Sequence, residues 1–192
     1  MEDPKSQSAS FSNSLLLATP AMDDPRFRFS VIYMINHDST GAMGLIINKA
    51  QPGLLISDLL EQIGISGDVK VADTPVLNGG PVDIDRGFVL HSADYFKPDS
   101  SLKISDTLSL TSTKDVLESL VSDDHPEKVI LAVGYAGWGP GQLEREISEN
   151  SWLIAKADDA LLFSDDLKSK WATVLTDMGI DPSCLSQDGG IA

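Results

Sequence analysis

The stretch SVIYMINHDSTGAMGLIINK, residues 30–49, decides the fold class. Its two apolar runs, VIYMIN and MGLIIN, lie on either side of the short glycine-containing turn STGA. Apolar, β-branched runs around a tight turn predict a β-hairpin over residues 31–49. The alternation of apolar and polar residues in SLKISDTLSLTST, residues 101–113, predicts a second hairpin with one face in solvent.

The segments around these hairpins predict further short strands and helices. SLLLATPAM predicts a strand that ends at Pro20, and TPVLNGGPVDIDRGFVLHS predicts two strands around a Gly-Gly-Pro turn. ISDLLEQIG predicts a helix with Ser57 as N-cap and Gly64 as its stop. The remaining predicted elements are a helix at KDVLESLV capped by Thr113, a strand at NSWLIAKA, and a helix at DDLKSKWATVLTDMG with Leu167, Trp171, Val174 and Leu175 on one face. Because strands and helices do not alternate regularly, we expect an α+β domain with a mixed, largely antiparallel sheet.

A third stretch, VILAVGYAGWGPGQLEREI at residues 129–147, predicts a buried strand, a glycine-rich loop and an acidic amphipathic helix. A strand that feeds such a loop and a helix N-terminus is typical of phosphate sites. The loop lacks the lysine of a P-loop, and Gln142 stands where a dinucleotide-binding pattern has its third glycine. Pro140 suits the first helical position, while Glu144 and Glu146 complement the positive helix end. We therefore expect no bound phosphate.

The composition limits the class of partner. The chain has 192 residues, with 14 Lys and Arg against 29 Asp and Glu, and a net charge of −15. This length predicts one domain, over residues 13–192, after a serine-rich tail at residues 1–12 that we expect to be disordered. The negative charge disfavours direct binding to nucleic acid or to an anionic membrane.

Targeting features predict a cytoplasmic protein. The acidic start MEDPKSQ does not resemble a secretory signal, and the apolar runs are too short to cross a bilayer. The single cysteine, Cys184, excludes an intrachain disulfide and a cysteine-based zinc site within one chain, which fits a reducing compartment.

Few residues suggest catalysis or metal binding. The sequence lacks the G-x-S-x-G, H-E-x-x-H and EF-hand patterns. His37 and His91 each end a predicted strand and are expected at one rim of the sheet, either as a metal pair or bonded to backbone and water. The lack of a suitably spaced third ligand favours the second interpretation. Asp83 and Asp85 are expected to cap a turn and to pair loosely with Arg86, rather than to act as acid and base or to bind a cation. We therefore assign no catalytic residue, no metal ligand and no cofactor.

The aromatic residues of the glycine-rich stretch leave two alternatives. Tyr135 and Trp138 either contact a ligand or partner, or close the core. If the stretch is also a binding surface, Trp138 should stand partly exposed at a groove rim, while Gly137 and Gly139 should set the turn through positive φ or close backbone approach. The candidate binding residues surround the Gly-Gly-Pro turn and the GYAGWG stretch, or end a neighbouring strand. They are His37, Asn48, Gly79, Gly80, His91, Tyr135, Trp138 and Gln142.

Four segments carry a family resemblance. LLLATPAMDDPRFRFSVIYMINHDSTGAMGLIINK, LNGGPVDIDRGFVLHS, TSTKDVLESL and GYAGWGPGQLEREISENSWLIA resemble, in order and spacing, the bacterial YqgE/AlgH family. The resemblance implies a sheet that is split and curled into a pseudo-barrel with helices around it. It implies no catalytic residues, and it links the chain by name to regulation of alginate and virulence gene expression. Members usually end in Gly-His-Ala, whereas Ile191 takes the place of that histidine in this chain.

Two functional hypotheses follow from the residues and the resemblance. The first is a cytoplasmic regulatory or adaptor protein that influences transcription indirectly, through a protein partner or a small ligand. The alternative is an enzyme or sensor that binds a small molecule in the same groove, with His37, Asn48 and His91 as polar anchors. Direct DNA binding is disfavoured by charge, and the sequence specifies no oligomeric state.

Overall fold

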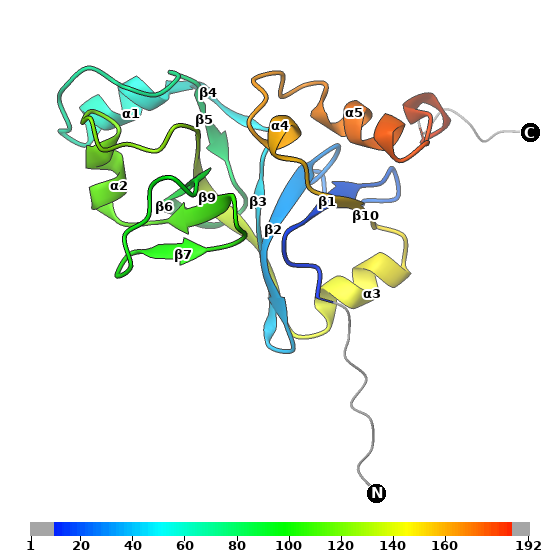
Figure 1. Cartoon of the computed structure of the whole chain (residues 1–192). Helices are drawn as coiled ribbons and strands as arrows, with labels where there is room; N and C mark the ends of the chain where they lie inside the picture. Colours follow the sequence, from blue (N-terminus) through cyan, green and yellow to red (C-terminus); the bar gives the residue numbers. More distant parts are fainter. Residues whose placement is uncertain (1–9, 186–192) are drawn as a thin grey trace, which may run out of the picture.

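The computed structural model describes residues 10–185, which form a ten-stranded sheet with helices around it (Figure 1). The strands are β1 (Ser14–Ala18), β2 (Val31–Asp38), β3 (Gly41–Ile46), β4 (Ala50–Leu55), β5 (Pro75–Asn78), β6 (Val82–Ser92), β7 (Ser101–Lys103), β8 (Leu108–Thr111), β9 (Val129–Trp138) and β10 (Trp152–Lys156). The helices are α1 (Ile56–Gln62), α2 (Lys114–Ser119), α3 (Gln142–Ser148), α4 (Asp159–Leu162), α5 (Lys170–Asp177) and the 3₁₀ helix η1 (Pro182–Leu185). Ile191 lies outside the described residues.

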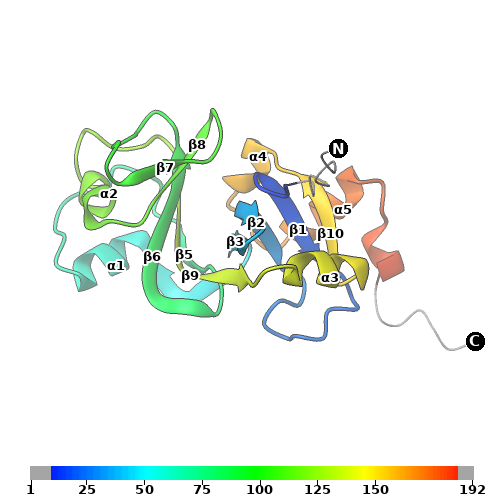
Figure 2. The same cartoon turned by 90° about the horizontal axis from the view of Figure 1, so that it is seen from below.

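The sheet is mixed and mostly antiparallel. Its strand order is β10-β1-β2-β3-β9-β6-β8-β7, with β4 and β5 paired to each other beside this path. The pairing of β5 with β9 is parallel, and the other pairings are antiparallel. The sheet curls into a half-barrel, with β1, β2 and β10 on one side and β6 to β8 on the other (Figures 1 and 2). The α+β prediction and both predicted hairpins are confirmed.

Strand β9 joins the two sides of the sheet. Its first half pairs with β5 and β6, whereas Ala136 to Trp138 pair with β3. Gly134 lies at the change of partner and has φ of 72°. A left-handed conformation of this kind favours glycine, and here it lets one strand serve both sides.

Residues 134–138 of the GYAGWG stretch are therefore strand rather than loop, which corrects the sequence prediction. The turn is confined to residues 139–141, and α3 begins at Gln142 after Gly141, the N-cap residue, with φ of 69°. Pro140 precedes the N-cap and does not occupy the first helical position. Positive φ occurs at Gly134 and Gly141, not at Gly137 or Gly139 as expected.

The apolar run of β1 is buried on both faces of the sheet. Leu15 and Leu17 face the cluster that α4 and α5 cover, and Leu16 faces a second cluster beneath α3. A third cluster lies beneath α1 and α2. Burial on both faces explains why β1 reads SLLLA without polar alternation.

Three local predictions need correction. The N-cap of α1 is Leu55, whose backbone N–H donates to Asp58 Oδ2 at 2.9 Å, whereas Ser57 lies within the helix and donates to Asp73 through its backbone N–H and its hydroxyl. Strand β8 has no solvent face, since it lies between β6 and β7 and all four residues are buried. The helix predicted at residues 165–179 is shorter in the structure, where α5 covers only Lys170–Asp177, and α4 at Asp159–Leu162 is a separate helix that the sequence does not predict. Within residues 10–185, no helix is long and apolar enough to cross a membrane.

Candidate functional site

The Gly-Gly-Pro turn crosses β9 at backbone contact. The N–H of Gly79 donates to the carbonyl of Val133 at 2.8 Å. A Cβ atom placed on Gly80, which has φ of 150°, would lie 2.1 Å from the carbonyl carbon of Tyr135, and one on Gly134 would lie 2.4 Å from the Gly80 carbonyl oxygen. These glycines therefore permit two backbones to cross. Gly79 and Gly80, two of the candidate binding residues, have a structural role that accounts for their identity.

A groove lies beside this crossing, where the sequence analysis expected one. We call it the tryptophan groove; its volume is about 370 Å³, and its wall includes Pro81, Val82 and Gly137. The aromatic, charged and amide side chains that line it are Asp23, Asp24, Arg26, Phe27, Trp138, Gln142, Glu146 and Trp152. The Gly-Gly-Pro turn and the GYAGWG stretch thus meet at one cavity.

Glu146 holds the aromatic wall of the tryptophan groove. Its Oε2 atom accepts hydrogen bonds from the indole N–H groups of Trp138, at 2.9 Å, and Trp152, at 2.8 Å. Its Oε1 atom accepts from the Gln142 amide at 2.9 Å. The two indole rings meet edge to face with centroids 5.9 Å apart, and Phe27 meets Trp152 in the same way at 5.7 Å. A charged acceptor shared by two donors makes this wall rigid.

Trp138 is more buried than predicted. It is 7% exposed and belongs to the cluster beneath α3, so the expectation of a partly exposed rim residue is wrong. It nevertheless lines the tryptophan groove with Gln142, so one side chain contributes both to the core and to the cavity wall. The alternatives of core and contact surface are not exclusive at this position.

The tryptophan groove carries more negative than positive charge. Asp23, Asp24 and Glu146 face one cation, Arg26, which forms an ion pair with Asp24 at 2.6 Å. The hydrogen bond from Arg26 holds the pKa of Asp24 below its usual value. The Arg26 guanidinium also lies over the Phe27 ring, 5.9 Å from its centroid. Aromatic faces beside carboxylates suit cationic groups.

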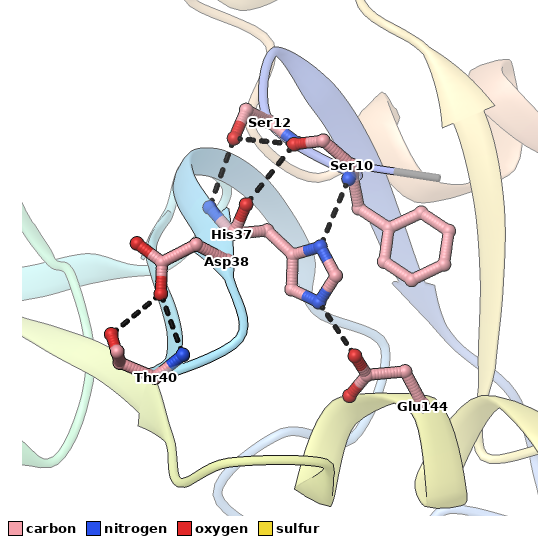
Figure 3. Close-up of polar contacts among 7 residues, drawn as sticks. Ser10, Ser12, His37, Asp38, Thr40 and Glu144 are labelled. Atoms are coloured by element: carbon pink, nitrogen blue, oxygen red, sulfur yellow. Dashed lines mark hydrogen bonds and ion pairs between the residues drawn. The ribbon is translucent and has the colours of Figure 1, made fainter. Parts of the chain in front are cut away.

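His37 ties the N-terminal segment to α3 (Figure 3). Its Nδ1 atom accepts from the backbone N–H of Phe11 at 3.2 Å, and its Nε2 atom is 3.0 Å from Glu144 Oε1. Ser12 Oγ accepts from the His37 backbone N–H at 2.9 Å, and Ser10 Oγ donates to the His37 carbonyl at 3.1 Å. An acceptor role for Nδ1 leaves the proton of a neutral ring on Nε2, facing Glu144.

The other polar candidates lie elsewhere. His91 is fully buried, with Nε2 2.9 Å from Thr111 Oγ1 and Nδ1 2.9 Å from the Ser92 carbonyl oxygen. Burial lowers the pKa of His91, which favours the neutral ring. Asn48 accepts from the Val31 N–H and donates to the Phe29 carbonyl, so it fastens the base of the first hairpin.

Within the part of the chain that the structure describes, the two histidines share no hydrogen-bond partner. His37 contacts the N-terminal segment and α3, whereas His91 contacts β8 and its own backbone. Within residues 10–185, no three His, Cys, Asp or Glu side chains form a group suited to a metal ion. That the purified protein carries no stoichiometric transition metal stays a prediction, which elemental analysis tests.

The sequence analysis missed Trp152, Phe27 and the role of Glu146. One signal was available: Gln142 and Glu146 are four residues apart on a helix, so their side chains meet. Nothing local indicates that this pair also receives a tryptophan from β9 and another from β10.

Comparison with known proteins gives the family. A model of the AlgH-like family matches residues 15–183. A UPF0301 protein of Caulobacter vibrioides is 45% identical over 179 residues, which cover 93% of this chain and 92% of the relative. One from Nitrobacter hamburgensis is 46% identical over 185 residues, covering 93% of this chain and 86% of the relative.

Solved structures agree with this assignment. The solution structure of the AlgH protein from Pseudomonas aeruginosa is similar to this chain with a TM-score of 0.76 and 35% identity, covering 100% of both chains. A crystal structure of a protein from Corynebacterium diphtheriae has a TM-score of 0.65 at 20% identity, covers 92% of this chain and 90% of that chain, and supports the fold alone. The chain belongs to the AlgH-like family.

Proposed function

We propose that this protein is a non-catalytic regulatory adaptor of the cytoplasm, which influences transcription through a protein partner and receives an arginine side chain of that partner in the tryptophan groove. The observation that carries the proposal is the wall of this groove, where the rings of Phe27, Trp138 and Trp152 stand beside the carboxylates of Asp23 and Asp24. The regulatory part rests on the resemblance to the YqgE/AlgH family.

Arg26 supports the choice of arginine. This residue of the chain itself makes a bidentate contact with Asp24 and lies over Phe27 at the same groove. A guanidinium combines flat stacking on an aromatic ring with paired hydrogen bonds to a carboxylate, whereas a lysine ammonium does not. A second guanidinium, from a partner, would find Asp23 at the exposed rim.

The absence of catalysis is supported by the hydrogen bonds of the groove. Both oxygens of Glu146 accept hydrogen bonds from neighbouring side chains. Gln142 is held in turn by the backbone N–H of Gly139 at 3.0 Å. Groups fixed in this way stabilise the wall, and they are poorly placed to exchange protons with a substrate.

A peptide titration tests the proposal. The probe is a blocked Gly-Arg-Gly peptide, compared with the equivalent lysine and glutamate peptides, and the readout is the NMR signal of each indole N–H. We expect the arginine peptide to shift the signals of Trp138 and Trp152, the lysine peptide to shift them less, and Trp171 to be unchanged, because Trp171 bonds the Ala18 carbonyl away from the groove.

Matched variants complete the test. Asp23→Asn combined with Asp24→Asn removes the groove carboxylates, and Asp68→Asn removes one exposed carboxylate that does not line this groove. We expect the peptide response to be lost in the double variant and kept in Asp68→Asn. Equal responses in both proteins, or no response to the arginine peptide, would contradict the proposal.

The indirect link to transcription has its own test. With a net charge of −15, the pure protein should bind duplex DNA no more tightly than roughly 10⁻⁴ to 10⁻⁶ M at physiological salt. Fluorescence anisotropy with labelled promoter fragments measures this affinity. Sequence-selective nanomolar binding by the pure protein would favour the direct regulator instead.

A further inference from the structure

We infer that a second cavity, larger than the tryptophan groove, binds a small monocarboxylate with an apolar body. The cavity has a volume of about 710 Å³ and lies between the β2–β3 hairpin and strands β6 to β8. It is separate in its chemistry from the arginine site proposed above, and neither inference depends on the other. This volume is in the usual range for sites that bind small organic molecules.

A bulge in β6 forms part of the cavity wall. Val82 pairs with Tyr135 and Gly87 pairs with Val133, so residues 83–86 of β6 stand opposite the single residue Gly134. Asp83 has φ of 47°, which residues other than glycine, Asn and Asp rarely adopt. Bulges bend a strand and redirect its side chains, often beside binding sites. Here Asp83 and Arg86, from the two ends of the bulge, line the cavity.

Arg86 gives the cavity an anion-binding group. Its Nη2 atom donates to Ser112 Oγ at 3.0 Å, and its guanidinium lies 5.2 Å from the centroid of the Phe88 ring. Among residues 10–185, no carboxylate lies within ion-pair distance of Arg86. Arginine has five N–H donors, so most of them are available to a ligand carboxylate.

Lys103 adds a second positive charge at the same cavity. Its ammonium contacts Asp106 at 2.9 Å, but the Asp106 side chain is 98% exposed and the pair is therefore weak. A ligand carboxylate can compete for this lysine. Asp83 also lines the cavity and would repel a second negative group on the ligand. Two cations and one carboxylate together favour a monoanion over a dianion.

Apolar side chains supply the rest of the wall. Phe88 and Tyr135 meet edge to face, with ring centroids 5.7 Å apart. Ile35 of β2 and Met43 of β3 line the opposite side of the cavity. A ligand with a short alkyl or aryl body can therefore bury apolar surface while its carboxylate meets Arg86. This combination specifies the ligand class.

Calorimetric titration at low ionic strength tests the inference on the full-length protein. The probes are octanoate, octanamide as its neutral counterpart, and suberate as a dianion of the same chain length. We expect octanoate to bind about tenfold more tightly than octanamide, because the amide cannot form the charge-assisted contact with Arg86. Suberate should also bind more weakly than octanoate.

Two variants locate the site. Arg86→Gln removes the charge at the bulge, and Arg145→Gln removes an exposed arginine on α3 that does not line this cavity. We expect octanoate affinity to fall about tenfold in Arg86→Gln and to be unchanged in Arg145→Gln. Thermal melting of both variants shows that the fold is intact. Equal binding of octanoate and octanamide, equal affinity in both variants, or no binding of octanoate overturns the inference.

Discussion

Trp138 and Trp152 donate their indole N–H groups to one oxygen atom, Oε2 of Glu146. Trp138 ends β9 and Trp152 begins β10. The Glu146 side chain of α3 therefore links the strand that precedes its helix in the chain to the strand that follows it. Both indoles are nearly buried, at 7% and 3% exposed. Without this acceptor, two donors would be left without partners in an apolar cluster.

Removal of the shared acceptor should destabilise the fold. Glu146→Ala leaves two buried indole donors unsatisfied, each of which costs roughly 1–3 kcal/mol, so we expect a loss of about 3 kcal/mol in the free energy of unfolding. Urea denaturation followed by tryptophan fluorescence measures it. Glu149→Gln, an exposed change at the end of the same helix, should stay within about 0.5 kcal/mol of wild type. Comparable losses in the two variants would argue against the shared acceptor.

The backbone crossing predicts which glycines tolerate a side chain. Gly80→Ala places a methyl group 2.1 Å from the Tyr135 carbonyl carbon at a φ that L-residues avoid. We expect a loss of more than about 3 kcal/mol, or no folded protein. Gly139→Ala is the control, since the nearest atom to its new Cβ is Gln142 Oε1 at 3.9 Å. Thermal melting compares them, and a Gly80→Ala protein as stable as Gly139→Ala would refute the crossing.

The His37 contacts predict local rather than global loosening. His37→Ala removes the acceptor for the Phe11 N–H and the partner of Glu144. We expect the amide of Phe11 to exchange with deuterium at least about tenfold faster, because terminal segments with few contacts open readily. Hydrogen exchange read by NMR gives the rate. Glu144→Gln keeps a side-chain oxygen for the Nε2–H, so Phe11 should exchange near the wild-type rate there.

Lys170 makes stability depend on pH. The residue is 1% exposed, its ammonium donates to the carbonyls of Leu161 and Leu162, and burial lowers its pKa from 10.5 to about 8. Between about pH 8 and pH 10.5 the unfolded chain keeps a proton on Lys170 that the folded protein has lost, so the free energy of unfolding rises with pH. From about pH 7 to about pH 9.5 the titration of Lys170 should raise the free energy of unfolding by roughly 2 kcal/mol.

The Lys170→Met variant isolates this effect. Its stability should rise less than that of wild type, when both are unfolded in urea at the same two pH values, because only the contribution of Lys49, whose pKa burial also lowers, remains. Burial raises the pKa of Tyr33, so this residue lowers the free energy of unfolding as pH rises. Its effect begins only above about pH 10, the usual pKa of tyrosine. Parallel pH profiles of wild type and Lys170→Met would show that Lys170 is not the group responsible.

Elements specified by neighbouring residues were predictable from the sequence. The hairpin at 31–49 follows from two apolar runs and a turn, and both strands formed. The sequence predicts the GYAGWG stretch as a loop, because glycines are typical of turns, but residues 134–138 are strand. Gly134 is needed where a chain segment more than 50 residues earlier, at Gly80, crosses the strand. That requirement belongs to the tertiary structure and leaves no local pattern.

The residues of the candidate site likewise fall into those that the local sequence indicates and those that depend on the tertiary structure. Trp138 and Gln142 lie at the tryptophan groove and were selected because they adjoin the glycine-rich stretch. His91 and Asn48 were selected as strand-end polar residues, but their hydrogen bonds are made inside the fold. The sequence predicts Arg86 only as a loose partner of Asp83 and Asp85, but no carboxylate of residues 10–185 lies within ion-pair distance of it. The bulge that directs it into the larger cavity depends on the register of β6 against β9.

The pairing of β1 with β10 also affects how the protein is made in the cell. Ser14 pairs with Lys156, so one edge of β1 has no partner until the ribosome has added β10, near the end of the chain. At roughly 5–20 residues per second this interval is on the order of ten seconds. Throughout it, the apolar run of β1 presents an open strand edge, which is a template for association with other nascent chains. Messages truncated before β10 should therefore yield products that depend on chaperones and proteases for their removal.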